Sequence, residues 1–263
     1  MKEILDRASP LWGICPFVKI KDNLIECRAK SRLPVNSRSV IITAFPYLLD
    51  EKYYKDSNIS KYSVPADYHP IITARLDKAA GELREKYPGY EFEVFADNSP
   101  IPEVRAASIA GIGVIGSNSL LITERYGSFV FLGEIVTDMP LAAGNGEIKE
   151  CIKCGRCTAA CPGSAIINGK IDREKCLSHI TQKKGILTEE EKNMIRSSGC
   201  IWGCDICQNV CPLNSGADLT QIKEFEETAK NRADADTPIE GRAYAWRGEK
   251  VIRRNLELQK EKE

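Results

Sequence analysis

Nine of the eleven cysteines in this 263-residue sequence lie between positions 151 and 211. The first of them form a C-x2-C-x2-C-x3-C-P run made of Cys151, Cys154, Cys157, Cys161 and Pro162. Three thiols separated by two residues let one tight loop reach three corners of an iron–sulfur cubane, while the proline directs the fourth thiol toward another cluster. Because clustered thiols in a reducing compartment do not persist as disulfides, this spacing predicts metal binding.

A second cysteine run returns the chain toward the first. It repeats the later part of the first pattern, which has the spacing of bacterial ferredoxins, and consists of Cys204, Cys207, Cys211 and Pro212. The crossing of ligands between the two runs predicts two 4Fe-4S clusters. The first cluster takes Cys151, Cys154, Cys157 and Cys211, and the second takes Cys161, Cys204, Cys207 and one further cysteine.

The candidates for that eighth ligand are Cys176 and Cys200, and spacing alone does not decide between them. Zinc is the competing interpretation of the whole group. A zinc site takes four ligands, whereas two cubanes use eight of the nine cysteines and account for both Cys-Pro pairs, so we favour iron–sulfur clusters. The remaining thiols, Cys15 and Cys27, follow no ligand pattern, and we expect them to be buried or idle.

The elements that position these residues follow from the hydrophobic pattern. Strands are predicted over residues 39–45, 91–96, 120–123 and 128–136. An amphipathic helix is predicted over residues 70–87, where apolar side chains recur every 3.6 residues, and a second helix runs from Pro102 to Gly111. Residues 50–68 are expected to form a long loop. This mixture predicts the α+β class.

Three parts are expected along the chain. An α/β cofactor domain takes residues 1–150, a ferredoxin-like module takes 151–215, and a helical tail packed on the body takes 216–263. No apolar stretch approaches the eighteen or so residues that a membrane span needs, and the first residues lack an export signal, so we expect a cytoplasmic protein with no membrane contact. The net charge of zero argues against tight, sequence-independent binding of nucleic acid.

A glycine-rich segment, Gly111-Ile-Gly113-Val-Ile-Gly116, matches the G-x-G-x-x-G pattern of dinucleotide-binding proteins. That motif should follow a strand and open a helix, but here a helical pattern precedes it and a strand pattern follows it. We therefore do not expect a dinucleotide. The glycines instead permit close approach of the backbone to a bulky partner.

Further ordered motifs resemble the epoxyqueuosine reductase family. They are Lys61-Tyr62, Asp67-Tyr68-His69, Ala96-Asp97-Asn98-Ser99-Pro100, the glycine segment with Ser117-Asn118-Ser119-Leu-Leu-Ile122 after it, Tyr126-Gly127-Ser128, Phe131-Leu-Gly-Glu-Ile-Val-Thr-Asp138, Lys175-Cys176-Leu-Ser, and the run from Gly203 to Pro212. The resemblance covers nearly the whole chain. It implies a cobalamin domain similar to that of reductive dehalogenases, two 4Fe-4S clusters, base-off cobalamin, and reduction of the epoxide of epoxyqueuosine in tRNA to give queuosine.

The resemblance also implies roles for single residues. Cys176 becomes the eighth cluster ligand, and Cys200 becomes a spare thiol. Asp97 becomes the proton donor above the corrin, because opening an epoxide to an alkene releases its oxygen as water; the alternative is that Asp97 only caps the turn before Pro100. The implied contacts to cobalamin come from Tyr68, His69, Gly113, Gly116, Ser117, Asn118 and Ser119. The other histidine, His179, is expected to pack on a helix that flanks Cys176.

The sequence departs from the family pattern in two ways. Val114, Ser117 and Asn118 stand where the family usually has Trp, Lys and His. Well-known members also continue into helical repeats implicated in gripping tRNA, whereas this sequence ends at Glu263, so we expect a short form for which tRNA is the least supported partner. An external low-potential electron donor is implied in either case. Two alternatives stay open: a corrinoid reductase that acts on a small molecule without tRNA, and a non-catalytic ferredoxin-like electron carrier.

Overall fold

The computed structural model describes residues 1–144, 146–236 and 238–261 and divides into two compact units. Unit 1 comprises Met1–Pro46, His69–Gly116 and Leu120–Ile152, and unit 2 comprises Tyr47–Tyr68, Ser117–Ser119 and Lys153–Glu263. The expected division at residues 150 and 215 stays a prediction, and the segment 47–68 groups with the cysteine-bearing residues rather than with the preceding part of the chain.

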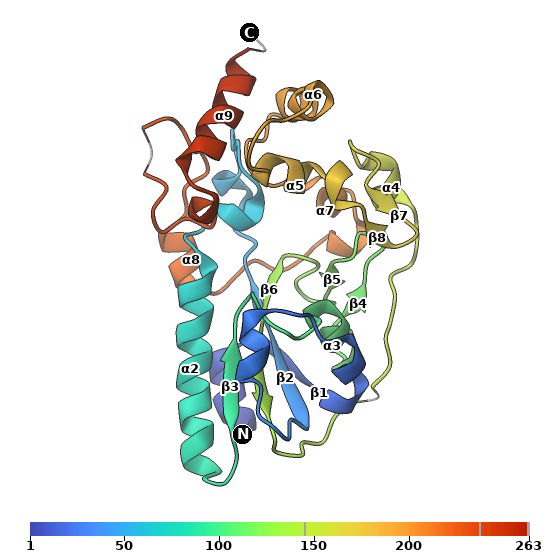
Figure 1. Cartoon of the computed structure of the whole chain (residues 1–263), viewed down its shortest axis with the longest axis vertical. Coiled ribbons are helices and arrows are strands. Elements are labelled where there is room, and N and C mark those ends of the chain that lie inside the picture. Colours follow the sequence, from blue (N-terminus) through green and yellow to red (C-terminus); the bar gives the residue numbers. More distant parts are fainter. Residues whose placement is uncertain (145, 237, 262–263) are drawn as a thin grey trace. The chain divides into compact units, whose positions relative to one another are not determined.

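Unit 1 is built on a four-stranded sheet (Figure 1). Its strands are β1 (Leu11–Pro16), β2 (Ser39–Pro46), β6 (Val130–Thr137) and β3 (Phe92–Phe95), in the order β1-β2-β6-β3. Every pairing is antiparallel. All eight residues of the β-branched central strand β2 are buried, which requires cover on both faces of the sheet.

Helices provide that cover. The long helix α2 (Tyr68–Lys86) packs on one face and buries Ile72, Leu76, Ala79, Ala80 and Leu83, the apolar stripe that the sequence predicted. A Cβ on Gly133 of β6 would stand 2.8 Å from the Cδ1 atom of Leu76, so this glycine lets α2 lie close to the sheet. The short helix α3 (Glu103–Ile109) packs on the other face, where its alanines contact the side chains of β2.

The remaining elements of unit 1 are short. Helix α1 (Lys2–Ala8) packs on β1, and β4 (Val114–Ile115) forms a small hairpin with β5 (Leu121–Ile122). The predicted strands and both predicted helices are confirmed, with boundaries shifted by up to two residues. Strand β1 was missed, because its Leu-Trp-Gly-Ile-Cys-Pro sequence contains a glycine and a proline, both of which are depleted in strands.

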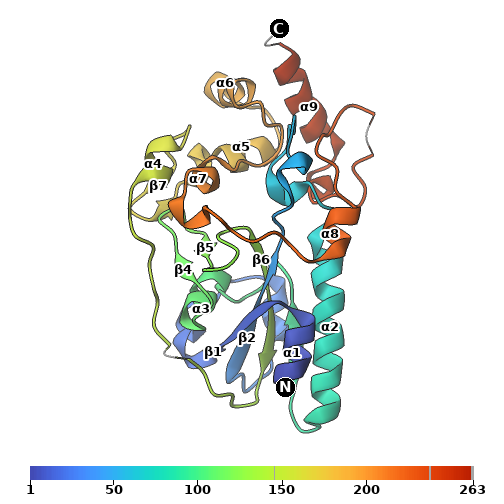
Figure 2. The same cartoon turned by 180° about the vertical axis from the view of Figure 1, so that it is seen from behind.

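Unit 2 consists of helices and loops with a pair of very short strands (Figure 2). Its helices and strands are α4 (Arg156–Ala160), β7 (Ile166–Ile167), β8 (Lys170–Ile171), α5 (Leu177–Gln182), α6 (Glu189–Ser198), α7 (Ile206–Asn209), α8 (Lys223–Glu227) and α9 (Glu249–Lys260). The segment 47–68 joins them through a β-bridge from Ile59 to Trp202. Trp202 is fully buried in a core cluster that also takes Tyr244 and Ile252 from the last fifty residues.

The two helices expected after residue 215 are present as α8 and α9, and α9 packs on α5 and α6. The side-chain amide of Asn255, which is completely buried, donates to the carbonyl oxygens of Thr181 at 2.7 Å and Ile201 at 2.8 Å. The tail is therefore part of the packing of unit 2. Among the described residues, no helix is both long enough and apolar enough to cross a bilayer.

Candidate functional site

Two cysteines of unit 2 lie in its short helices, and the others lie in the turns and loops beside them. Cys157 lies in α4, which begins after Gly155 in the left-handed region at φ 78° and ends at Cys161. Cys176 precedes α5, and Cys207 lies in α7. Both Cys-Pro pairs end a helical turn with the cysteine in extended backbone, so each proline marks a sharp stop where a thiol leaves the helix.

Two loops that carry cysteines pass very close to one another. A Cβ on Gly163 would lie 1.9 Å from the carbonyl oxygen of Lys175, a distance that no side chain could tolerate. Gly163 follows Cys161 and Pro162, and Lys175 precedes Cys176. The glycine therefore allows the segment after Cys161 to approach the segment before Cys176.

The thiols fall into neighbourhoods that follow the crossing pattern. Burial and the nearby thiols of Cys176, Cys161 and Cys157 raise the pKa of Cys207 to about 11. The pKa of Cys211 is raised by burial and then by Cys154 and Cys157. Cys207 from the second run thus lies close to Cys161 and Cys176, and Cys211 lies close to Cys154, while Cys157 lies near both.

Two further proposed ligands are Cys204 and Cys151. Burial raises the pKa of Cys204 to about 12, with Cys207 and Cys200 as its neighbouring thiols. Cys151 lies in unit 1, where its backbone N–H donates to the carbonyl oxygen of Ile115 at 2.9 Å. No three His, Cys, Asp or Glu side chains in the described residues converge closely enough to hold a single metal ion. The ligands of a cubane stand at its separated corners, so the chemistry of this thiol set fits such clusters.

Hydrogen-bond direction separates a proposed ligand from the spare thiol. The Ala165 N–H donates to the Cys161 sulfur at 3.3 Å, as backbone donors do around metal-bound sulfur. The Cys200 thiol instead donates to the carbonyl oxygens of Trp202 at 3.1 Å and Gly203 at 3.4 Å, which only a protonated sulfur can do. Burial raises its pKa to about 12, in keeping with a thiol.

The cysteines outside the module are placed as expected. Cys15 is completely buried in the core of unit 1, and its burial raises its pKa to about 12. Cys27 is partly buried against the same core. His179 lies in α5, as predicted, with its Nε2 atom 3.7 Å from a carboxylate oxygen of Glu174.

In unit 1, Asp97 and His69 form a polar pair. The His69 Nε2 atom is 3.0 Å from Asp97 Oδ2, and the Asn98 N–H donates to Asp97 Oδ1 at 2.7 Å. Asp97 and Asn98 both have left-handed backbones, with φ of 58° and 44°. Two consecutive non-glycine residues in this region carry strain of the kind found at functional sites. With 60% of its side chain exposed, Asp97 is within reach of solvent or a bound molecule.

A buried pair of carboxylic acids accompanies Asp97, and neither of them was among the site residues predicted from the sequence. Glu134 of β6 is completely buried, and Glu103 opens α3. Burial and the facing carboxyl of Glu103 raise the pKa of Glu134 well above the usual range. Burial likewise raises the pKa of Glu103 to about 7. The available signal was a glutamate in the otherwise apolar run 129–136.

The glycines of the glycine-rich segment are explained by local packing. The segment follows α3 and enters the β4–β5 hairpin, so the strand-to-helix context of a dinucleotide site is absent from it. A Cβ on Gly113 would stand 2.7 Å from the carbonyl oxygen of Ile122, so β5 fills the space beside this glycine. The Gly116 N–H donates to the carbonyl oxygen of Leu120 at 2.8 Å and closes the hairpin turn.

The polar residues after the glycine segment belong to unit 2. Asn118 is buried, and its side chain hydrogen-bonds to the Cys207 thiol and favours the thiolate. The Ser119 hydroxyl donates to the carbonyl oxygen of Gly169 at 3.2 Å. Both residues therefore support the cysteine module. Tyr68, half-buried, is the first residue of α2. The cobalamin contacts expected of these residues and of Ser117 stay a prediction.

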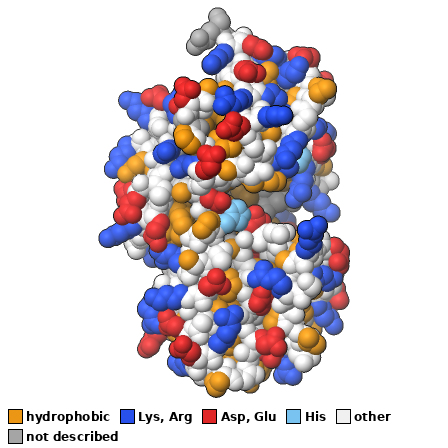
Figure 3. All heavy atoms as spheres, turned by 60° about the vertical axis from the view of Figure 1, so that its left-hand side comes forward, with side chains coloured by type: hydrophobic (Ala, Val, Ile, Leu, Met, Phe, Trp, Pro, Cys, Tyr) orange, Lys and Arg blue, Asp and Glu red, His pale blue; other side chains and the backbone are white. Residues whose placement is uncertain are grey.

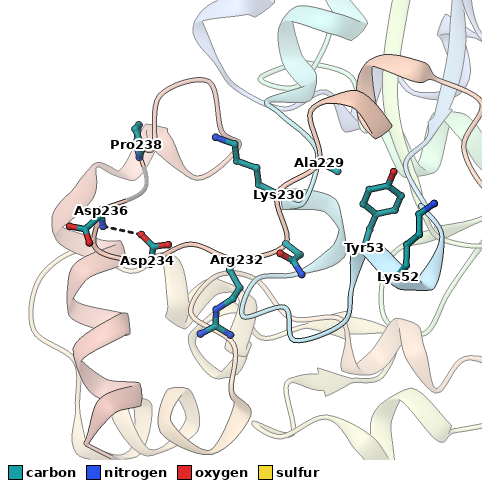
Figure 4. A pocket seen from close by; sticks show the side chains of 9 residues that line it. Lys52, Tyr53, Ala229, Lys230, Arg232, Asp234, Asp236 and Pro238 are labelled. Atoms are coloured by element: carbon teal, nitrogen blue, oxygen red, sulfur yellow. Dashed lines mark hydrogen bonds between the residues drawn. The ribbon is translucent and has the colours of Figure 1, made fainter.

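An open pocket of about 730 Å³ lies elsewhere in unit 2 (Figure 4). Its lining mixes bases and acids: Lys52, Tyr53, Ala229, Lys230, Asn231, Arg232, Asp234, Asp236 and Pro238. The Asp236 N–H donates to the Asp234 carboxylate at 2.9 Å, so part of this wall is held by its own turn. It contains none of the predicted site residues. The face shown in Figure 3 is similarly mixed in charge, with basic and acidic side chains interspersed.

Comparison with known proteins gives two family matches. Residues 150–214 match the 4Fe-4S double cluster binding domain, and residues 28–98 match the family described as epoxyqueuosine reductase QueG. The first match covers all nine clustered cysteines. The second match ends at Asn98, just after Asp97.

Curated relatives extend the similarity over most of the chain. An epoxyqueuosine reductase from Lactococcus garvieae is 30% identical over 87% of this chain and 70% of its own length, and one from Listeria monocytogenes is 31% identical over 91% and 73%. The chain spans about half of other relatives, such as 53% of the Bacillus subtilis enzyme, which is 33% identical.

Solved structures have the same architecture. The epoxyqueuosine reductase of Streptococcus thermophilus matches with a TM-score of 0.78 and 25% identity, covering 98% of this chain and 79% of that one. A crystal structure of an epoxyqueuosine reductase with an epoxyqueuosine-modified tRNA-Tyr stem loop matches with a TM-score of 0.81 and 25% identity, covering 99% and 80%. The α+β fold with an iron–sulfur module is thereby confirmed.

Proposed function

The chain belongs to the epoxyqueuosine reductase family, and from this we propose that it reduces the epoxide of epoxyqueuosine in tRNA to the alkene of queuosine. The reaction consumes two electrons and two protons and releases the epoxide oxygen as water. It therefore needs a path for electrons and a source of protons. The observation that carries the proposal is that Cys207 and Cys211 of the second run lie near thiols of the first run, which suits the crossed ligand pattern of a two-cluster reductase.

The proposed ligands of the first cluster are Cys151, Cys154, Cys157 and Cys211, and those of the second are Cys161, Cys176, Cys204 and Cys207. When bound, the clusters and a base-off cobalamin supply the electrons and the nucleophilic cobalt that opening an epoxide requires. Cys200 stays outside the ligand set, because its thiol donates to two carbonyl oxygens. An external low-potential donor supplies the electrons, and we place the enzyme in the cytoplasm, where thiols remain reduced.

The histidines of the chain are compatible with a corrinoid that takes no histidine ligand from the protein. The chain has two histidines, and each faces a carboxylate, His69 at 3.0 Å and His179 at 3.7 Å. The side chains proposed to contact the cofactor are those of Tyr68, His69 and Ser117. Gly113, Gly116, Asn118 and Ser119 have the structural roles given above, and any contact from them adds to those roles.

Asp97 is the proposed acid. Its carboxyl is exposed enough to reach a substrate, and His69 and the Asn98 N–H fix its two oxygens. In this role Asp97 protonates the oxygen that leaves the substrate, and His69 sets the orientation and charge of the carboxyl. The same contacts also satisfy the turn before Pro100, so the capping role and the acid role are compatible.

Turnover of Asp97→Asn tests this assignment. We expect the rate to fall by about a hundredfold or more, because the amide keeps the shape of the carboxyl but cannot donate a proton. Iron and cobalamin content should equal those of the wild type. Asp77→Asn, at an exposed position of α2, is the matched control and should keep full activity. Full activity of Asp97→Asn would remove this residue from the mechanism.

Two measurements separate the alternatives. An equilibrium titration with cobalamin comes first, since a protein that fails to bind it is an electron carrier and not a corrinoid reductase. Turnover of an epoxyqueuosine-containing anticodon stem-loop is then compared with turnover of the free nucleoside. We expect a clear preference for the stem-loop. Equal or better use of the nucleoside would instead identify a reductase for small molecules.

A further inference from the structure

The reaction proposed above needs two protons in each cycle, whereas Asp97 can hold only one. The second proton must therefore reach Asp97 or its neighbours from elsewhere. The structure contains an acid pair that the mechanism so far does not use, Glu103 and Glu134. Both belong to unit 1, as do Asp97 and His69.

Glu134 occupies an unusual position on the sheet. Its cross-strand partners are Ile42 on β2 and Phe95 on β3, and both side chains belong to the buried core beneath α3. None of the Glu134 side chain is exposed, and both of its oxygens lack a hydrogen bond of normal geometry. A carboxylate left in this state would cost several kcal/mol, so the side chain must hold a proton.

The position of Glu134 connects it to the acid site. Its partner Phe95 ends β3, and Asp97 follows two residues later. Ser99 and Glu103, which come next along the chain, are the side chains that act most directly on the Glu134 carboxyl. Glu103 in turn lies within electrostatic range of both Asp97 and His69. Glu103 and Glu134 thus lie between the apolar core of unit 1 and the exposed carboxyl of Asp97.

The groups around the pair favour one shared proton. Glu103 and Glu134 repel one another when both are ionised, and Asp97 adds further negative charge. His69 acts in the opposite direction, because its charge lowers the pKa of Glu103. A coupled pair of this kind loses its protons in two separate steps, and the proton of the pair is held at neutral pH.

We propose that Glu103 and Glu134 share a proton that recharges the Asp97–His69 pair after Asp97 has protonated the substrate oxygen. This inference rests on the proposed function. Asp97 gives its proton to the oxygen as the first carbon–oxygen bond breaks, receives the stored proton from the Glu103 side, and gives it to the same oxygen as water leaves. The two electrons come from the external donor, and two protons from solvent restore the cycle, one to Asp97 and one to the pair. Glu103 and Glu134 are positioning residues that act through Asp97.

Infrared spectroscopy of the cluster-loaded full chain tests the stored proton without any turnover. We expect a carbonyl absorption of a protonated carboxyl at neutral pH that is absent in Glu134→Gln. Glutamine keeps the size of the side chain and resembles the neutral acid, so the variant should fold. Glu85→Gln, on the exposed side of α2, is the matched control and should leave the absorption unchanged. Identical spectra of wild type and Glu134→Gln would overturn the proposal.

The pH profile of turnover tests the relay itself. At acid pH, solvent protons can recharge Asp97 directly, so Glu134→Gln should approach the wild-type rate. At alkaline pH its rate should fall at least tenfold below the wild type, with iron and cobalamin content unchanged. A pH profile that matches the wild type would overturn the relay while leaving the reductase function intact. If the wild type itself turns over no epoxyqueuosine substrate, the proposed function fails, and the infrared result still decides whether the pair stores a proton.

Discussion

At the scale of single residues, hydrogen-bond direction distinguishes cysteines that look equivalent in the sequence. Cys176 and Cys200 were both compatible with the spacing of the eighth ligand. The structure places Cys176 near Cys207, and it places the Cys200 thiol as a donor to two carbonyl oxygens. Spacing could not provide this distinction, because the direction in which a thiol points depends on packing between distant segments.

Serine substitutions at these two positions test the ligand choice. Cys200→Ser should retain about eight irons after anaerobic reconstitution, because serine keeps a donor for the same carbonyl oxygens. Cys176→Ser should lose one cubane and retain about four irons. Iron analysis and low-temperature electron paramagnetic resonance of the reduced proteins measure both. Loss of iron in Cys200→Ser, with full loading of Cys176→Ser, would reverse the assignment.

The buried acid of β6 also makes stability depend on pH. The pKa of Glu134 is higher in the folded chain than in the unfolded chain, chiefly because of burial, so the folded state binds the proton more tightly. Stability is therefore greatest below the ordinary carboxyl pKa and falls as the pH rises toward the folded value. Glu134→Gln should flatten this decline from the ordinary carboxyl pKa of about 4.3 upward, as measured by thermal unfolding. An equally steep decline in the variant would show that Glu134 is ionised in the folded protein.

At the scale of elements, the sequence predicted the regular parts of the fold and missed the short ones. Helix α2 was predictable because five apolar residues repeat at the helical period. Helix α6 was overlooked, although Thr188 and Glu191 form a complete capping box at its start. The pairing of β3 with β6, which places Glu134 beside Phe95, joins residues that are far apart in the sequence, and local patterns do not encode it.

The contact between α2 and the sheet can be tested by a double-mutant cycle. Leu76→Ala should lower the free energy of unfolding by about 2–5 kcal/mol, because this side chain is completely buried. Gly133→Ala should cost about 1–3 kcal/mol, since its new Cβ would stand 2.8 Å from Leu76 and 3.0 Å from Ile72. The double variant should cost less than the sum, because the smaller side chain makes room for the methyl group. Strict additivity in denaturant unfolding would contradict this packing.

At the scale of the whole molecule, the last fifty residues are part of unit 2 and not an appendage. Tyr244 and Ile252 share a core cluster with Trp202, and Asn255 ties α9 to Thr181 of α5 and to Ile201 after α6. The sequence indicated two helices in this region but not what they cover, since Glu226 of α8 contacts Tyr53, 173 positions away, and Asn255 of α9 contacts Thr181, 74 positions away. The candidate cluster ligands were predictable from the spacing of the cysteines along the chain, whereas the acid site was indicated only by family resemblance.

The link through Asn255 can be measured directly. Asn255→Ala should lower the free energy of unfolding by about 2 kcal/mol, because two buried carbonyl oxygens lose their donor. Glu257→Ala lies on the exposed side of the same helix and should change stability by less than about 0.5 kcal/mol. Both variants are compared by denaturant unfolding of the cluster-loaded chain. Equal effects of the two substitutions would show that α9 is not anchored by this side chain.

The central claim is that the chain is a reductase that opens an epoxide with the help of Asp97. The most direct measurement incubates the anaerobically reconstituted, cobalamin-loaded protein with a low-potential reductant and an epoxyqueuosine-containing stem-loop, then analyses the nucleosides by mass spectrometry. We expect one queuosine for every two electrons consumed by the wild type, and at least a hundredfold slower formation with Asp97→Asn. Full loading of clusters and cobalamin without any conversion of epoxyqueuosine would contradict the central claim.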